Sequence, residues 1–282
     1  MKLRYDAVGF VRAHGSPYHK VQVFAALGEQ DSPEFAAAVK DLRAIRDSKG
    51  RWPWRWNPAH PWAIGETARA TKLLLEIGED RDGELVQSAI DCFIRRQRTD
   101  GGWSNNPDLE PLIPKEWDWL SADDSSPAVT GEVLSCLAAI GYQSTDRISR
   151  ARKFIYKTQD KEGGWPTHVG RAYNYGFDPA AFAEVIAGLL DTGDTARAIV
   201  IAKAEHAIRI HKPEWPEPAF NPLDTFLMLG MDPLSPDVDY CVRLLIERQR
   251  NDGGWNWFGD LPSDPGQTAY WLPKLILCGV TV

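Results

Sequence analysis

The chain lacks several features that would assign it to a common functional class. Its 282 residues include four cysteines with no CxxC pair, and they contain no basic run, no P-loop and no G-x-S-x-G motif. The missing basic run and a net charge of −7 exclude a nucleic-acid partner, because phosphate binding needs a clustered basic surface. No stretch reaches the roughly 18 apolar residues of a membrane span. Hydrophobic residues still make up 43% of the chain, which is enough for a large buried core.

The N-terminus and the cysteine pattern indicate a cytoplasmic protein. Residues 1–10 lack the apolar core of a secretory signal. Widely spaced cysteines in a chain of this size predict reduced, buried thiols. These cysteines are Cys92, Cys136, Cys241 and Cys278. The sequence leaves a peripheral membrane contact open and does not specify an oligomeric state.

A repeated motif organises the chain. Three segments fit Q-x-x-x-G-x-W: QRTDGGW (97–103), QDKEGGW (159–165) and QRNDGGW (249–255). Two degenerate copies, RDSKGRW (46–52) and RIHKPEW (209–215), have Arg in place of Gln. Glycine permits a tight turn, the Gln amide can bond freed backbone carbonyls, and tryptophan can cover a helix end. We therefore expect the motif tryptophans to be structural. They are Trp52, Trp103, Trp165, Trp215 and Trp255.

Each motif follows a pair of predicted helices. An amphipathic outer helix precedes it, as in 85–96 and 238–248. A more apolar inner helix comes earlier, as in 66–78, 129–141 and 180–190. The repeating unit is an inner helix, a short turn, an outer helix and a Gly-Trp loop.

The two ends of the chain complete the pattern. Residues 267–279 form a predicted inner helix with no outer helix after it, and residues 6–15 form a predicted outer helix with no inner helix before it. Pairing them closes the chain, and closure buries the apolar faces that single hairpins expose. The predicted fold is therefore all-α, an (α/α)6 toroid or barrel of six helical hairpins, with residues 1–282 forming one domain.

The loops predict a functional mouth at one end of this toroid. The turns from inner to outer helices are short, whereas most loops from outer to inner helices are long. The long loops are 52–62, 103–127, 165–179 and 255–266. Long loops that carry aromatic and acidic residues usually mark a functional site.

The Q-x-x-x-G-x-W motif in this helical frame resembles the QW repeat of the squalene-hopene and oxidosqualene cyclases. The protein prenyltransferase β subunits share the toroid and are looser relatives. Those cyclases use two such domains, so this chain is similar to single-domain class II terpene cyclases. The resemblance implies cyclisation of an isoprenoid or meroterpenoid, started by protonation in an aromatic-lined bore. It implies no metal and no cofactor.

In that family a D-x-D-D motif supplies the proton donor. The nearest match is SADD (121–124), in which Asp123 falls at the donor's place and Asp124 lies beside it. Asp264 and Asp178 each keep only the first acid, and Glu66 stands where the last one would be. The alternative for each is an N-cap or first-turn acid on its helix.

Aromatic side chains can stabilise a passing carbocation. The substrate-binding candidates of this kind are Trp54, Trp56, Trp62, Trp119, Tyr173, Phe177, Trp257 and Trp271. The alternative is that they plug the end of the toroid. Arg55 and His60 could hold an anionic head group, or they could be solvated loop charges.

Two other function classes remain open. Toroids of this kind also serve carbohydrate-active lyases and hydrolases, and a non-catalytic lipid-binding toroid could have lost D-x-D-D. Zinc, which the prenyltransferases hold through Asp, Cys and His, is not expected, because Asp239 and Cys241 lie on a predicted outer helix.

Overall fold

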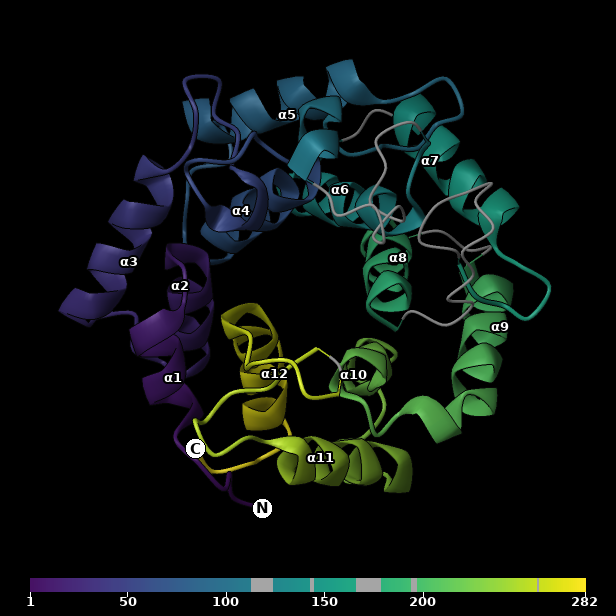
Figure 1. Ribbon diagram of the computed structural model, residues 1–282. Helices are drawn as coiled ribbons and strands as arrows, with labels where there is room; N and C mark the ends of the chain where they lie inside the picture. The colour runs from purple at the N-terminus through teal and green to yellow at the C-terminus, as the bar shows by residue number, and fades with distance from the viewer. Residues whose placement is uncertain (113–123, 143–144, 166–178, 194–196, 258) are drawn as a thin grey trace. The chain divides into compact units, whose positions relative to one another are not determined.

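The structure is a computed structural model and is helical (Figure 1). It describes residues 1–112, 124–142, 145–165, 179–193, 197–257 and 259–282. The chain divides into two compact units. Unit 2 is residues 45–210, and unit 1 combines residues 1–44 with residues 211–282.

Unit 2 consists of two layers of helices. The inner layer is α4 (Ile64–Glu76), α6 (Pro127–Ile140) and α8 (Pro179–Asp191). The outer layer is α5 (Glu84–Arg96), α7 (Thr145–Thr158) and α9 (Arg197–Ile210). Two 3-10 turns, η1 (Trp54–Trp56) and η2 (Pro107–Leu112), lie in the loops. The inner helices pack on one another in order, and each outer helix packs on the inner helix before it in the chain (Figure 1).

Unit 1 is built in the same way from both ends of the chain. Its helices are α1 (Ala7–His14), α2 (Pro17–Ala26), α3 (Pro33–Ala44), α10 (Leu223–Met228), α11 (Pro236–Arg248) and α12 (Pro265–Leu277), with the 3-10 turns η4 (Lys212–Glu214) and η5 (Pro218–Phe220). Helix α12 packs against α1, which confirms the predicted pairing of the two ends. The backbone N–H of Leu3 also donates to the carbonyl oxygen of Thr281, at 3.0 Å. The count of six hairpins and the single domain stay predictions.

The three complete Q-x-x-x-G-x-W copies make the same contacts, which we call the clasp. In each clasp the Gln side-chain amide donates two hydrogen bonds, one to its own loop and one to a carbonyl in the first turn of the next outer helix or just before it. Gln97 bonds the carbonyls of Gly101 (2.9 Å) and Arg147 (2.9 Å), Gln159 those of Gly163 (2.9 Å) and Val200 (2.8 Å), and Gln249 those of Gly253 (3.0 Å) and Tyr5 (3.0 Å). The Gln amide therefore bridges neighbouring repeats, and does not serve the end of its own helix.

The motif tryptophan joins the outer helix before it to the inner helix after it. The indole N–H of Trp103 donates to the carbonyl of Phe93 in α5 at 2.8 Å, and its backbone N–H donates to the hydroxyl of Thr130 in α6 at 3.0 Å. Trp255 repeats both bonds in unit 1, with Leu245 and Thr268. All five motif tryptophans are at most 1% exposed, which confirms that they are structural.

The first glycine of each clasp has a left-handed backbone and lies against the next outer helix. Gly101, Gly163 and Gly253 have φ values of 97°, 102° and 96°. A Cβ atom at Gly253 would overlap the carbonyl oxygen of Asp6, just before α1. Any larger residue here is therefore excluded by both the backbone conformation and the neighbouring helix.

The cysteines only partly match the prediction. All four are free, but Cys92 and Cys278 are half-buried, and only Cys136 and Cys241 are fully buried. None of the helices in the described ranges has the length and apolar character needed to cross a membrane.

The close approach at the clasp can be tested with two glycines of unit 1. Gly230 has a φ of 75° and open space around its Cβ position, so Gly230→Ala should cost only the left-handed strain, about 1 kcal/mol. Gly253→Ala adds the overlap with Asp6 and should cost about 2 kcal/mol more. Urea denaturation of both variants measures the difference. Equal destabilisation would show that the clasp does not require this approach.

Candidate functional site

Two glycines bring the inner helices α6 and α8 into backbone contact. A Cβ atom at Gly131 would overlap the carbonyl oxygen of Glu184, and one at Gly188 would lie 2.7 Å from the carbonyl oxygen of Gly131. The two helices therefore cross as closely as their backbones allow. This crossing places the residue after Gly131, Glu132, beside α8.

Four charged residues gather on the inner layer of unit 2, and we call them the acid cluster: Glu66 and Arg69 on α4, Glu132 on α6 and Glu184 on α8. The Arg69 guanidinium lies 3.3 Å from Glu66 Oε1 and 3.5 Å from Glu132 Oε1. The side chains of Glu66 and Glu132 are each 9% exposed, whereas that of Arg69 is 39% exposed. Within the described ranges, no group of three or more His, Cys, Asp or Glu side chains is placed to hold a metal ion.

The surroundings of Glu132 hold a proton on its carboxyl group. Burial raises the pKa of Glu132 from its ordinary 4.5 to about 8, because a buried carboxylate loses its hydration. Arg69 lowers this pKa, while Glu184 and Glu66 raise it. At neutral pH Glu132 is therefore a neutral carboxylic acid that can donate a proton.

The loop before α4 lies over the acid cluster. The backbone N–H of Arg55 donates to Glu66 Oε1 at 3.2 Å, and the Arg69 guanidinium lies 5.9 Å from the centre of the Trp56 ring. Arg55 and Trp56 have φ values of 53° and 58°, a left-handed conformation that is rare outside glycine. Such strain persists only where surrounding contacts impose it, and it concentrates at functional sites.

The other binding candidates in this loop, Trp54, Arg55 and His60, contact one another. The guanidinium of Arg55 lies 4.8 Å from the centre of the Trp54 ring. The centre of the His60 ring lies 5.4 Å from the centre of the same Trp54 ring. A ring nitrogen of His60 also bonds the carbonyl oxygen of Trp54, at 3.1 Å. The structure thus brings Trp54, Arg55, Trp56 and His60 together beside the acid cluster.

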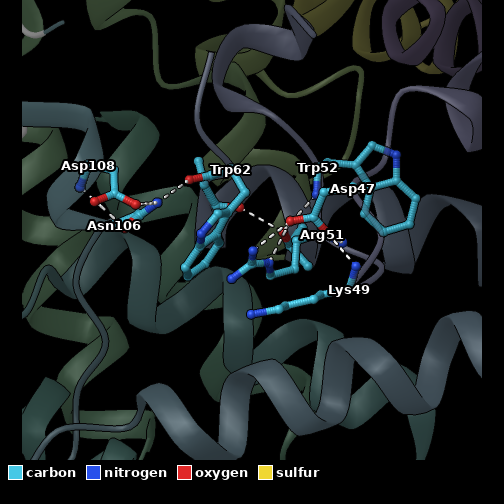
Figure 2. Close-up of polar contacts among 9 residues, drawn as sticks. Asp47, Lys49, Arg51, Trp52, Trp62, Asn106 and Asp108 are labelled. Atoms are coloured by element: carbon cyan, nitrogen blue, oxygen red, sulfur yellow. Dashed lines mark hydrogen bonds and ion pairs between the residues drawn. The ribbon is translucent and has the colours of Figure 1, made fainter. Parts of the chain in front are cut away.

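Trp62 closes the same loop by a different set of contacts (Figure 2). The guanidinium of Arg51 lies 4.2 Å from the centre of the Trp62 ring, and that of Arg96 lies 5.0 Å from it. Asp47 holds Arg51 through an ion pair of 2.6 Å, and Asn106 donates to the Trp62 carbonyl oxygen at 3.2 Å (Figure 2). Trp62 is only 8% exposed, so these contacts make it a buried support of the loop.

Two of the acids proposed from D-x-D-D, Asp124 and Asp264, lie just before inner helices. Asp124 is half-buried and precedes Ser126, which caps α6 by accepting a bond from the backbone N–H of Val129. Asp264 is the N-cap of α12 in unit 1, and its carboxylate accepts from the backbone N–H of Gln267 at 2.8 Å. Capping is therefore a role that Asp264 does fill.

The remaining candidates divide between unit 1 and the residues outside the described ranges. Trp257 is 42% exposed on the loop before α12, and Trp271 is 2% exposed within α12, next to the ring of Tyr270. The indole N–H of Trp271 is buried and has no hydrogen-bond partner among the described residues. Five candidates lie outside the described ranges: Trp119, Asp123, Tyr173, Phe177 and Asp178.

Sequence reasoning named Glu66 but missed Arg69, Glu132 and Glu184. A signal for the glutamates was present, since each is the only charged residue in a stretch of apolar helix, VTGEVLSCLAAIG and AAFAEVIAGLL. Such isolated charges on a buried helix need a partner or a function. The glutamates come close together only because α4, α6 and α8 pack against one another, and the Q-x-x-x-G-x-W motif does not predict the details of that packing.

The raised pKa of Glu132 predicts how stability depends on pH. The folded protein keeps a proton on Glu132 up to about pH 8, whereas the unfolded chain loses it near 4.5. Between these values the folded state binds more protons, so the free energy of unfolding should fall as pH rises, by up to about 1.4 kcal/mol per unit.

Urea denaturation between about pH 5 and pH 9 measures this effect. Glu132→Gln should remove this part of the slope and leave the variant more stable than wild type above pH 8. Glu205→Gln is the control, because Glu205 on α9 is 42% exposed and pairs with Arg209. Parallel curves for wild type and Glu132→Gln would contradict a protonated Glu132.

Comparison with known proteins finds similarity to terpenoid cyclases. The family model of the squalene-hopene cyclase C-terminal domain matches residues 116–215. Squalene–hopene cyclase of Zymomonas mobilis is 27% identical over 133 residues, which are 47% of this chain and 19% of that protein. Drimenyl diphosphate synthase of Streptantibioticus cattleyicolor is 26% identical over 187 residues, 64% of this chain and 31% of that protein. The chain thus spans less than a third of the length of these relatives.

The likeness to solved structures covers nearly the whole chain. Type II terpene cyclase MstE from Scytonema matches with a TM-score of 0.62 and 15% identity, over 93% of this chain and 88% of that one. A protein from Actinoplanes matches with a TM-score of 0.62 and 16% identity, over 93% of this chain and 90% of that one. The predicted all-α toroid fold is thereby confirmed. The chain has the fold of the terpenoid cyclase superfamily, as its Gln-Gly-Trp repeats indicate.

Proposed function

We propose that this protein is a class II terpene cyclase-like enzyme that cyclises an isoprenoid or meroterpenoid after protonating it. The observation that carries the proposal is the acid cluster. It combines a protonated buried carboxyl group with a neighbouring tryptophan, on the inner helices of a terpenoid cyclase fold. A carboxylic acid can start the reaction, and aromatic rings can stabilise the cation that follows.

The substrate class is supported by related proteins. MstE has been solved with geranylgeranyl dihydroxybenzoate as substrate and with merosterolic acid A as product. The matched curated relatives are squalene–hopene cyclases and a drimenyl diphosphate synthase. These names share an isoprenoid chain, and we extend this class of substrate to the present protein. Protonation by a carboxyl group requires no cofactor or metal.

The residues on the loop before α4 are the first binding candidates within unit 2. Trp56 lies beside Arg69 and could contact a cation formed near the acid cluster. Arg55 and His60 are placed next to Trp54 and could bind a carboxylate or diphosphate head group. For the proton donor, Asp123, Asp124, Asp264 and Asp178 remain candidates from the sequence.

The absence of a full D-x-D-D motif favours one alternative, a non-catalytic protein that binds an isoprenoid lipid. Such a protein would keep the aromatic side chains and release its ligand unchanged. Turnover and binding assays on the same substrates separate the two functions.

We expect the protein to isomerise an isoprenoid substrate and to add one solvent-derived hydrogen to the product. Incubation with geranylgeraniol, squalene or a prenylated aromatic acid should give a product of unchanged mass in water. In D2O the product should contain one deuterium, because protonation adds a solvent-derived hydrogen and a different proton leaves at the end. Mass spectrometry of extracts measures both masses. Tight binding of a substrate without any product would overturn the cyclase in favour of the lipid-binding protein.

A further inference from the structure

We propose that Glu132, on the second turn of α6, is the proton donor of this reaction and that Arg69 stabilises the carboxylate it leaves. This assignment rests on the proposed function, and it selects a residue outside the D-x-D-D pattern. Glu132 lies within α6, whereas Asp124 precedes the cap of that helix.

The geometry separates Glu132 from a structural acid. Its side chain is nine-tenths buried, yet its carboxyl group makes no hydrogen bond to the described residues. Its nearest charged partner is Arg69, at 3.5 Å. Burying a carboxyl group costs stability, and this one caps no helix, which points to a function that offsets the cost.

The neighbouring helix leaves a space shaped for this carboxyl group. A Cβ atom at Gly65 of α4 would overlap Glu132 Oε2. Gly65 does not have a left-handed backbone conformation, so the backbone of α4 does not require glycine at this position. The missing side chain therefore serves the position of the acid. On the opposite side, Gly131 fixes α6 against α8.

The charges around Glu132 suit both halves of a proton transfer. Glu66 on α4 and Glu184 on α8 disfavour a negative charge on Glu132, and so does its burial, so the proton is present before the reaction. Arg69 on α4 favours the negative charge that appears once the proton has left. Arg69 is also 39% exposed, so the cluster retains a polar route to solvent.

The step balances as follows. The Glu132 O–H bond breaks, and the π electrons of a substrate double bond form a new C–H bond with the released proton. The substrate becomes a carbocation, and Glu132 becomes a carboxylate beside Arg69. Ring closure uses further double bonds of the substrate, and loss of a proton from carbon ends the reaction. Solvent then returns a proton to Glu132.

Asp264 and Glu66 are less suited to this step. Asp264 accepts a hydrogen bond from the backbone of α12, so its carboxylate is already used as a cap. Glu66 accepts a bond from the backbone N–H of Arg55 and shares Arg69 with Glu132. Glu132 caps no helix, and burial raises its pKa to about 8.

The test compares Glu132→Gln with Glu205→Gln and wild type on the substrate that wild type converts. Glu132→Gln keeps the shape of the side chain and removes the acid, so turnover should fall at least about a hundredfold. Glu205→Gln should keep wild-type turnover, because Glu205 is exposed on α9. Wild-type activity should also fall as pH rises through about 8. Turnover by Glu132→Gln within about threefold of wild type would overturn the assignment.

Gly65→Ala provides a second variant that keeps the acid. Alanine suits a helix better than glycine does, so α4 should stay folded. The new Cβ displaces Glu132 Oε2, and turnover should fall at least about tenfold without a loss of thermal stability. Unchanged turnover would show that the position of Glu132 does not matter, and the assignment would fail.

Infrared spectroscopy separates this inference from the proposed function, because it requires no substrate. The wild-type spectrum minus that of Glu132→Gln should contain the C=O band of a protonated carboxyl group at pH 7, and the band should vanish as pH rises through about 8. If the band is present but wild type converts no substrate, the proposed function fails and the donor role fails with it. If wild type is active but the band is absent, only the assignment to Glu132 is overturned.

Discussion

The hydrogen bonds of the clasp are the constraint on which the rest of the structure depends. One Gln side chain bonds both its own loop and the next outer helix, so each repeat fixes the position of its neighbour. The adjoining tryptophan ties the preceding outer helix to the following inner helix through its two N–H groups. Because buried amide and indole groups are costly without partners, this set of bonds tolerates little change in geometry. Helices linked in this way form an ordered inner layer, although the motif residues lie in the loops and not in the inner helices.

The acid cluster is a product of that ordered layer. Gly131 and Gly188 let α6 and α8 meet backbone to backbone, and Gly65 leaves room for Glu132 beside α4. Glycine inside a helix normally weakens it, so three glycines at this one meeting point indicate a local requirement for closeness. Three glutamates and an arginine from three helices then share one small volume. The same packing that stabilises the layer creates the unusual chemistry of Glu132.

The sequence predicted the fold well because the clasp contacts are encoded locally and repeat. A Gln, a Gly and a Trp at fixed spacing specify the same turn wherever they occur, and the pairing of residues 6–15 with 267–279 followed from the repeating pattern. The site was harder to predict, because Glu66, Glu132 and Glu184 are brought together only by the crossing of three helices. The D-x-D-D pattern pointed instead to acids such as Asp264, which acts as a helix cap. Isolated charges in apolar helices were the better signal.

The clasp of Gln249 joins residues that are far apart in the chain, since its amide bonds the carbonyl of Tyr5. Unit 2 is a continuous stretch, residues 45–210, and its clasps connect repeats that follow one another. During synthesis on the ribosome, all segments of unit 2 are therefore present once residue 210 has emerged. Helices α1 and α2 are made earlier, yet both also pack against α12, which is made after unit 2. The faces of α1 and α2 that α12 covers therefore cannot be buried by that helix until residues 265–277 have emerged.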